Sequence, residues 1–478
     1  MMSPHPLWTR DEVLSATGGV AGPSDVDWHA SGVSIDSRTC RPGDLFIAFS
    51  GENLDGHDFL PDAFRAGAAA AVVSRDMDYA SRPLVRVDDG LHALNNLGRA
   101  ARDRCTAPVV AVTGSVGKTS TKEAIGLALG ALGTTHATLG NLNNQIGVPL
   151  TLARMPRDVN YAVVEMGMNH AGEISELSLL VRPDIGVITT IAAVHLEFFD
   201  HVAGIADAKA EIFEGMCQQG IAVLNRDNVY FAMLSTRAQA CGLKEVVGFG
   251  AHPEADIHLS TCESDDAGSN VTAQLNDRII HYRLNVPGRH WVQNSLTVLG
   301  TVSALDGDID LAAQALAELT PPKGRGTRIG VQLRDGVLTV IDDSYNASPA
   351  SMRAAFAVLG DSQPATGGRR IAVLGDMLEL GDASASLHAG LANDLAANRV
   401  DQVFCAGTNM AALDDALPAA MRGGTAADSQ ALAGPVCQAV TAGDVVLIKG
   451  SLGSRMAVVV DALCALDTDG RLETNNAV

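Results

Sequence analysis

PVVAVTGSVGKTS, residues 108–120, is the stretch that decides the fold of this chain. Its apolar part, 109–113, predicts a buried strand, and the pattern of residues 119–132 predicts a helix. A glycine-rich turn joins the two, so that backbone N–H groups of the turn and the helix N-terminus face the same point. Both features favour phosphate, and the stretch therefore predicts a nucleotide phosphate loop.

The predicted loop contains seven residues that we expect to contact the nucleotide: Gly114, Ser115, Val116, Gly117, Lys118, Thr119 and Ser120. We expect Lys118 to reach the β- and γ-phosphates and the Thr119 hydroxyl group to ligate Mg²⁺. A strict Walker pattern would place its first glycine at Val112, so this loop has the shorter form GxxGKT. The chain has only six lysines, so a lysine within a glycine-rich turn is less typical of an ordinary solvated surface residue and more typical of a functional one. The alternative is a chance GKT sequence at a helix start, which the flanking strand and helix disfavour.

Composition excludes several classes of protein. The chain has 478 residues, 47% of them hydrophobic, enough for about three packed domains of roughly 100–200 residues each. A formal net charge of -21 argues against an extended nucleic-acid partner, which needs a basic face. The eight cysteines include no CxxC pair and are typical of a reduced cytoplasmic protein. Residues 1–10 lack an apolar signal-peptide core, and the apolar run 68–73 is too short for a bilayer, so we expect a cytoplasmic protein without membrane insertion.

Strands and helices alternate along most of the chain, which predicts an α/β protein with mostly parallel sheets. We expect a small α/β domain at 1–105, a central phosphate-loop domain at 106–322 and a Rossmann-like domain at 323–478. Residues 246–287 are expected to add antiparallel strands to the central sheet, and PPKGRG at 321–326 is expected to be a hinge, because proline and glycine interrupt regular structure. The expected strands are 44–49, 70–74, 84–87, 109–113, 161–168, 185–191, 221–224, 337–342, 370–374, 402–405 and 445–448, and the expected helices are 91–104, 119–132, 172–181, 206–216, 293–305, 350–359 and 384–397.

Two polar residues, Glu165 and His195, are expected at the same edge of the central sheet as the phosphate loop, and Lys209 lies on a predicted helix that follows them. Glu165 ends the predicted strand YAVVE, and His195 follows the predicted strand DIGVITTI. Open α/β sheets bind ligands at this carboxyl edge, and Glu165 offers the oxygen ligands that Mg²⁺ takes. Read by itself, His195 is more typical of a loop histidine bonded to backbone. Lys209 lies on a predicted helix near Asp207 and Glu211, and by itself is more typical of a solvated lysine.

Three further motifs are candidates for ligand contacts. GRHWVQN, residues 288–294, offers Asn294 to an adenine, although a helix cap with a surface turn explains it as well. DDSYNASP, residues 342–349, ends a strand and begins a helix, and its adjacent carboxylates suit a ribose, a metal or an amine. Capping alone explains one of those two carboxylates. SIDSR, residues 34–38, suits a phosphate through Arg38, with a surface ion pair as the alternative.

A series of ordered motifs runs through the chain. They are GDLFIAFSGENLDGHDF (43–59), TGSVGKTS (113–120), GNLNNQIGVPLTL (140–152), VVEMGMNHAGEI (163–174), HLEFFD (195–200), AKAEIFEG (208–215), GRHWVQN (288–294), KGRGTR (323–328), DDSYNASPASM (342–352), LGDMLELGDASASLHAG (374–390) and IKGS (448–451). With these motifs the sequence resembles the Mur ligase family over essentially its whole length. GNLNNQIGVPLTL and LGDMLELG are similar to the branch that adds D-Ala-D-Ala to UDP-MurNAc-tripeptide, and the DNPR-type motif of the diaminopimelate-adding branch is not found.

The resemblance implies an ATP-dependent amide ligase. In the family, ATP phosphorylates the terminal carboxylate of the UDP-linked peptide, and the amine of D-Ala-D-Ala then attacks the acyl phosphate. A carboxylate is a poor electrophile, and phosphorylation supplies its leaving group. The peptide carboxylate and the γ-phosphate of ATP are both anions and repel each other. The resemblance implies that Lys118, Arg325 and Mg²⁺ supply the positive charge that reduces this repulsion. The hinge near 321–328 is implied to let the third domain close over ATP.

The motif match also implies a role for individual residues. It places Thr119 and Glu165 at one Mg²⁺, His195 with Lys209 at a second, Asn294 at the adenine, Asp343 at the ribose, Tyr345 on the base, Ser37 and Arg38 at the UDP-sugar, and Asn143 and Asn144 at the muramoyl substrate. The implied catalytic set is Lys118, His195, Lys209 and Arg325, and Lys209 is carbamylated in many family members. Trp291, Ser348, Thr190 and Ala192 depart from the usual pattern of the family without removing any of these residues. We expect a monomer.

Three other readings of the sequence predict different features. A folylpolyglutamate synthase-like ligase shares the phosphate loop and Lys209 but lacks a UDP-binding domain, whereas residues 1–105 carry DSR and GDLFIAF. A phosphotransferase or GTPase needs an acceptor or guanine-reading motif such as NKxD, and none is found. A catalytically inactive regulator is disfavoured by the intact residues Lys118, Glu165 and Lys209.

Overall fold

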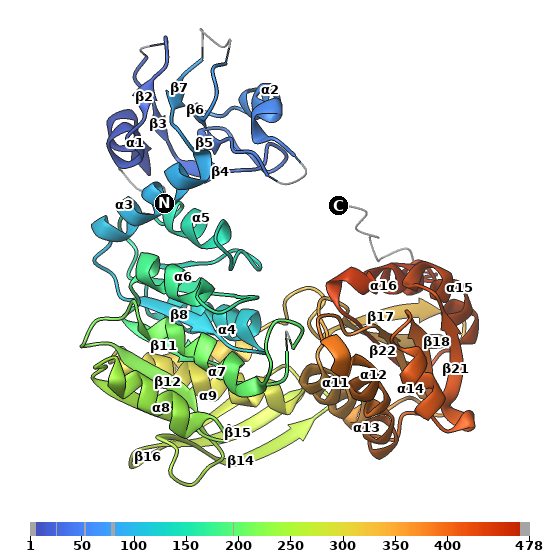
Figure 1. Cartoon of the computed structure of the whole chain (residues 1–478). Helices are drawn as coiled ribbons and strands as arrows, with labels where there is room; N and C mark the ends of the chain where they lie inside the picture. The colour runs from blue at the N-terminus through green and yellow to red at the C-terminus, as the bar shows by residue number, and fades with distance from the viewer. Residues whose placement is uncertain (1–5, 25, 52–53, 78–81, 195, 469–478) are drawn as a thin grey trace.

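The described residues form three large sheets and one two-stranded sheet, and the colours of Figure 1 show that the large sheets follow one another along the chain. The computed structural model describes residues 6–24, 26–51, 54–77, 82–194 and 196–468. A five-stranded sheet lies near the N-terminus, a nine-stranded sheet in the middle and a six-stranded sheet towards the C-terminus. The α/β class and the three-domain arrangement predicted from the sequence are confirmed. No helix among the described residues is long and apolar enough to cross a membrane.

The nine-stranded sheet is built around β8, which carries the phosphate loop at its carboxyl end. Its strand order is β16-β15-β14-β13-β12-β11-β8-β10-β9, and neighbours from β9 to β14 run parallel. The strands are β8 (Val109–Thr113), β9 (Thr135–Ala137), β10 (Tyr161–Glu165), β11 (Ile185–Ile188), β12 (Ile221–Asn225), β13 (Glu245–Gly250), β14 (Ile257–Asp265), β15 (Gly268–Leu275) and β16 (Arg278–Leu284). Because β8 lies between β10 and β11, the ends of these three strands meet at one place.

Helices cover both faces of the parallel part of this sheet, so strands such as β8 and β12 are buried on both sides. One layer packs on Val110 and Val112 and consists of α4 (Lys118–Leu132), α9 (Arg289–Ala304) and α10 (Ile309–Ala315). The other packs on Val109 and Ala111 and consists of α5 (Gly147–Ala153), α6 (Glu173–Val181), α7 (Val202–Ala210) and α8 (Phe231–Ala240). Helix α7 corresponds to the predicted helix 206–216, but it begins earlier, at Val202, and is followed by a 3₁₀ turn at Glu211–Phe213.

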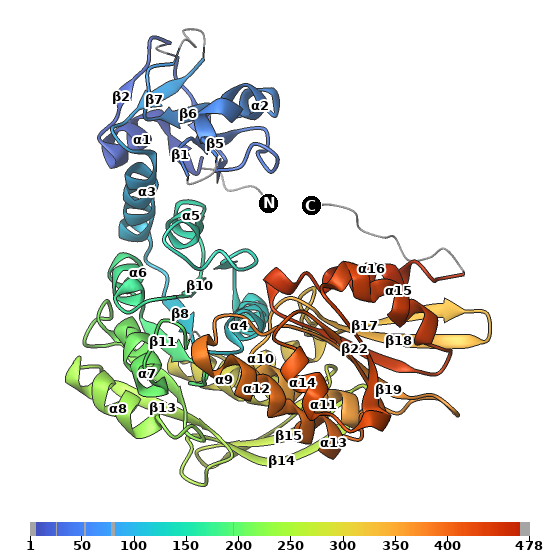
Figure 2. The ribbon, with the colours of Figure 1, turned by 45° about the vertical axis from the view of Figure 1, so that its right-hand side comes forward.

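The predicted antiparallel extension at 246–287 is wrong in its first part. Strand β13 pairs parallel with β12, and α8 makes the connection between them. Only Leu234 and Ala238 of α8 are buried, so its sequence carries little amphipathic signal. Antiparallel pairing begins at β14 with β15 and β16, and both views show β14 and β15 reaching towards the C-terminal part (Figures 1 and 2).

The N-terminal sheet has the order β2-β7-β6-β5-β4. Its elements and their neighbours are β1 (Trp8–Thr9), α1 (Arg10–Thr17), β2 (Val20–Ala21), β3 (His29–Ala30), β4 (Gly32–Ser34), β5 (Asp44–Ile47), α2 (Leu60–Arg65), β6 (Ala70–Val73), β7 (Leu84–Arg86) and α3 (Gly90–Arg104). Its apolar core also takes in Leu150 and Ala153 of α5. The Trp8 indole N–H donates to the carbonyl oxygen of Ala153 over 2.8 Å, so α5 joins the first sheet to the second.

The C-terminal sheet has the order β17-β18-β22-β19-β20-β21, with an antiparallel hairpin at β17–β18 and parallel pairs elsewhere. Its elements are β17 (Thr327–Leu333), β18 (Gly336–Asp343), α11 (Pro349–Asp361), β19 (Arg370–Gly375), α12 (Ser384–Ala389), α13 (Leu391–Ala397), β20 (Gln402–Ala406), α14 (Ala411–Ala416), β21 (Arg422–Ala426), α15 (Ser429–Ala439), β22 (Val445–Lys449) and α16 (Ala457–Cys464). The helix predicted at 384–397 is two helices that meet at Gly390.

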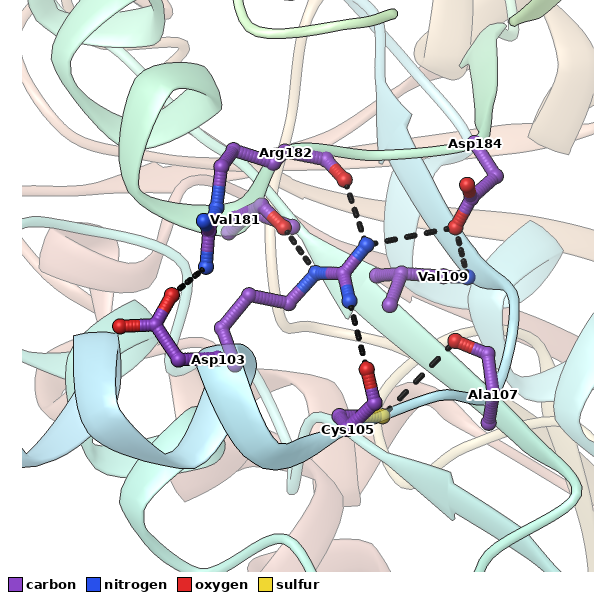
Figure 3. Close-up of polar contacts among 8 residues, drawn as sticks. Asp103, Cys105, Ala107, Val109, Val181, Arg182 and Asp184 are labelled. Atoms are coloured by element: carbon purple, nitrogen blue, oxygen red, sulfur yellow. Dashed lines mark hydrogen bonds and ion pairs between the residues drawn. The ribbon is translucent and has the colours of Figure 1, made fainter. Parts of the chain in front are cut away.

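Arg102, near the end of α3, ties the N-terminal part to the central sheet. Its guanidinium group donates to the carbonyl oxygens of Val181, Arg182 and Cys105 over 2.7, 2.9 and 3.1 Å, and to the Asp184 carboxylate over 3.4 Å. Figure 3 shows these acceptors gathered between the end of α6 and the start of β8. One side chain therefore donates hydrogen bonds to carbonyl groups at the end of α6 and just before β8, and to Asp184, which precedes β11.

We expect Arg102→Met to lower the free energy of unfolding by about 1–3 kcal/mol, because it leaves buried carbonyl groups without a donor. Arg182→Met is the matched control, since Arg182 pairs with Asp103 at the surface, where an ion pair contributes about 0–1 kcal/mol. Urea unfolding followed by circular dichroism compares the two variants. Equal losses of stability would contradict the role given to Arg102.

Candidate active site

The phosphate loop has the geometry that its sequence predicts. Gly114 and Gly117 adopt φ values of 148° and 87°, a region that favours glycine, and α4 begins directly afterwards at Lys118. A Cβ atom on Gly114 would lie 1.9 Å from the hydroxyl oxygen of Thr189. Thr189 itself donates to the carbonyl oxygen of Val116 over 2.6 Å. The loop therefore rests on the segment that follows β11.

Lys118 points back into the loop, where its ammonium group donates to the carbonyl oxygen of Gly114 over 2.8 Å. Burial lowers the pKa of Lys118, which the Glu165 carboxylate opposes and the Arg325 guanidinium reinforces. Two cations and one carboxylate therefore lie close enough to influence one another. This is the charge arrangement that a polyphosphate needs.

Glu165 is a fully buried carboxylate at the end of β10. Its Oε1 atom accepts hydrogen bonds from the Thr119 hydroxyl group over 3.1 Å and from the Asn143 amide over 2.7 Å. Its Oε2 atom is buried and has no hydrogen-bond partner among the described residues. A buried oxygen of this kind is costly unless it meets a cation, so Thr119 and Glu165 fit a Mg²⁺ ion.

Lys209 lies on α7 with 1% of its surface exposed. Burial lowers its pKa well below the ordinary value, and the nearby charge of Lys118 lowers it further. The sequence by itself favoured a solvated lysine, and the structure contradicts that reading. The predicted partner of Lys209, His195, lies outside the described residues. Within the described part of the chain, no group of three or more acidic, histidine or cysteine side chains is placed to hold a metal ion.

A cavity of about 550 Å³ opens between the central and C-terminal sheets, beside the phosphate loop. Among its lining residues are Ser115, Val116, Gly117, Lys118, Thr119, Ser120, Asn143, Glu165, Asn294, Arg325, Asp343, Tyr345 and Lys449. Most of the residues predicted from scattered motifs therefore meet in one place. Asn294, on α9, is 8% exposed, and its amide nitrogen is buried without a hydrogen-bond partner among the described residues.

The C-terminal side of the cavity carries its own network of charges. Arg325 donates to the Thr119 hydroxyl group over 3.1 Å, and its guanidinium carbon lies 4.3 Å from the centre of the Tyr345 ring. Asp343 pairs with Lys449 over 2.7 Å, and burial raises the pKa of Asp343 although Lys449 opposes this. Lys449 belongs to the motif IKGS, to which the sequence gave no role. The motif and the scarcity of lysine in the chain were the only signals in the sequence that could have singled it out.

Other predicted residues lie elsewhere. Arg38 is exposed in the N-terminal part and pairs with Asp36 over 2.7 Å, as the ion-pair alternative predicts, and neither Arg38 nor Ser37 lines the cavity. Asn144 turns away from Asn143, because its side-chain oxygen accepts the N–H of Gly147 over 2.9 Å at the start of α5. The two adjacent asparagines therefore differ, and Asn143 alone contacts Glu165.

Comparisons with known proteins agree with this arrangement. Three family models match consecutive parts of the chain: "Mur ligase family, catalytic domain" at residues 29–102, "Mur ligase middle domain" at 112–302 and "Mur ligase, glutamate ligase domain" at 324–452. The UDP-N-acetylmuramoyl-tripeptide–D-alanyl-D-alanine ligase of Escherichia coli (strain K12) is 36% identical over 90% of this chain and 93% of its own length. The chain belongs to the Mur ligase family.

Solved structures of Mur ligases show the same fold. A crystal structure of MurF from Acinetobacter baumannii is 30% identical, covers 96% of this chain and 99% of its own, and superposes with a TM-score of 0.83. The MurF ligase of Thermotoga maritima in complex with ADP is 26% identical, covers 91% of this chain and 97% of its own, and has a TM-score of 0.75. The similarity therefore spans all three sheets.

We expect Lys118→Ala to lower the rate of ADP formation by at least about 100-fold, because the loop loses the ammonium group that lies within it beside Glu165. Lys244→Ala, which changes an exposed lysine just before β13, should keep its activity. ADP release is measured by a coupled assay, and circular dichroism checks that both variants are folded. Near-normal turnover by Lys118→Ala would rule out the phosphate-loop assignment.

Proposed function

We propose that this protein is an ATP-dependent ligase that joins D-Ala-D-Ala to UDP-MurNAc-tripeptide in the cytoplasm, as a step of peptidoglycan precursor synthesis. The observation that carries the proposal is the meeting of the phosphate loop, Glu165 and Arg325 in one cavity between two sheets. The relatives that share most of the chain are named for the same reaction, which supports the choice of substrates. Residues 1–105, 106–322 and 323–478 are proposed as the three domains, in a monomer that does not bind nucleic acid.

The reaction requires two anions to approach, a peptide carboxylate and the γ-phosphate of ATP. Lys118 and Arg325 reach the same point from the central and C-terminal parts and reduce the repulsion between them. The carboxylate oxygen bonds to phosphorus, and ADP leaves. The amine of D-Ala-D-Ala then bonds to the acyl carbon, which releases that oxygen with phosphate.

Thr119 and Glu165 are proposed to hold one Mg²⁺, and His195 with Lys209 a second. Bound Mg²⁺ supplies positive charge to the phosphate oxygens. A lysine ammonium group is unsuited to a metal ion, whereas the carbamate that this lysine carries in many family members offers oxygen ligands. Burial lowers the pKa of Lys209, which is the direction that carbamate formation needs.

The remaining predicted residues are proposed to bind the two nucleotides. The buried, unpaired amide of Asn294 suits an adenine, while Asp343 and Tyr345 lie on the opposite wall for the ribose and base. Ser37 and Arg38 are proposed at the UDP group, and Asn143 and Asn144 at the muramoyl part. Gly324 and Gly326 have φ values of 73° and 91°, which suits a hinge that closes the cavity.

ADP release by the purified protein with ATP and Mg²⁺, omitting each substrate in turn, tests the proposal. We expect release to require both UDP-MurNAc-tripeptide and D-Ala-D-Ala, because the acyl phosphate turns over only when an amine attacks it. Release that requires a different amine would place the protein in another branch of the family. The absence of release with every combination would contradict the proposed activity.

A further inference from the structure

Lys122 is a fully buried cation on the phosphate-loop helix, and the proposed chemistry does not use it. It lies one turn after Lys118 on α4, and none of its surface is exposed. An ammonium group is costly to bury unless each of its N–H bonds finds an acceptor. The acceptors of Lys122 therefore indicate why a lysine stands at this position.

Three acceptors surround the Lys122 ammonium group. It donates to the carbonyl oxygens of Thr138 and Gly140 over 2.7 and 3.2 Å and to the carboxylate of Glu123. Strand β9 is the edge of the sheet, and its pairing with β10 ends at Ala137, so both carbonyl groups lie beyond the ladder. An apolar side chain in place of Lys122 would leave them without this donor.

The segment that Lys122 holds, residues 138–143, wraps around Glu165. The Thr138 hydroxyl oxygen accepts the backbone N–H of Glu165 over 3.0 Å. At the other end of the segment, the Asn143 carbonyl oxygen accepts the N–H of Gly167 over 2.7 Å, and the Asn143 amide donates to the Glu165 carboxylate. The segment thus fixes Glu165 through its backbone and through its side chain.

We propose that Lys122 is a positioning residue, which clamps the 138–143 segment to α4 and so fixes Glu165 at a set distance from the phosphate loop. The first turn of α4 carries Lys118 and Thr119, and its second turn carries Lys122. One rigid helix therefore holds the phosphate loop and the carboxylate opposite it. This role rests on the proposed use of Glu165 as a Mg²⁺ ligand.

Hydrogen–deuterium exchange of the ligand-free protein tests the clamp directly. In Lys122→Met we expect exchange of the peptide covering 139–147 to rise by about tenfold, because its anchoring bonds are lost. Glu123→Gln is the matched control: the Glu123 side chain is 43% exposed, and its loss leaves both carbonyl contacts of Lys122, so exchange should stay unchanged. Lys122→Gln, whose amide still donates to one carbonyl group, should give an intermediate increase. Exchange at the wild-type rate in Lys122→Met and Lys122→Gln would overturn the proposal.

The Mg²⁺ dependence of ADP release tests the link to Glu165. We expect Lys122→Met to raise the half-saturating Mg²⁺ concentration by about tenfold, as loss of a residue that orients a metal ligand does. In an Asn143→Ala background the same change should have much less effect, because the segment has then lost its side-chain contact with Glu165. Equal, additive effects in both backgrounds would overturn the positioning role. A wild-type protein that releases no ADP would instead contradict the proposed function, and the exchange experiment would still decide the clamp.

Discussion

One hydroxyl group connects the parts of this site. Thr119 donates to Glu165 within the central sheet and accepts from Arg325, which lies within the 321–326 segment that leads to the C-terminal sheet. Its position is fixed because it stands in the first turn of α4, directly after the phosphate loop. Thr119 therefore links the phosphate loop, the buried carboxylate of Glu165 and the segment that connects the central and C-terminal sheets.

Positively charged side chains are concentrated at the cavity between the central and C-terminal sheets. The chain carries a net charge of -21, yet Lys118, Arg325 and Lys449 gather around one cavity. Each is held by a specific partner: a loop carbonyl group for Lys118, the Tyr345 ring for Arg325 and the Asp343 carboxylate for Lys449. Positive charge that is placed in advance needs little rearrangement when anionic groups enter.

The sequence predicted this site well where the chemistry is local. The strand, turn and helix at 109–132 and the strand that ends at Glu165 needed only periodicity and glycine. The meeting of distant segments was predicted only through the family resemblance, which grouped Arg325 with the phosphate loop. No local pattern relates Arg325 to the Thr119 hydroxyl group, or Lys122 to Thr138. Helix α8 was missed because it buries too few side chains to show a period. The reading of Lys209 as a solvated lysine, made from its neighbours in the sequence, was wrong because its burial depends on packing across the sheet.

The central claim is that the peptide carboxylate is activated by phosphorylation within this cavity, and an isotope-transfer experiment tests it most directly. UDP-MurNAc-tripeptide labelled with ¹⁸O in both oxygens of its terminal carboxylate is converted with unlabelled ATP, and the released phosphate is analysed by mass spectrometry. The account predicts that each phosphate carries one ¹⁸O atom, because the oxygen that bonds to phosphorus leaves with it. Unlabelled phosphate accompanying amide formation would contradict the account.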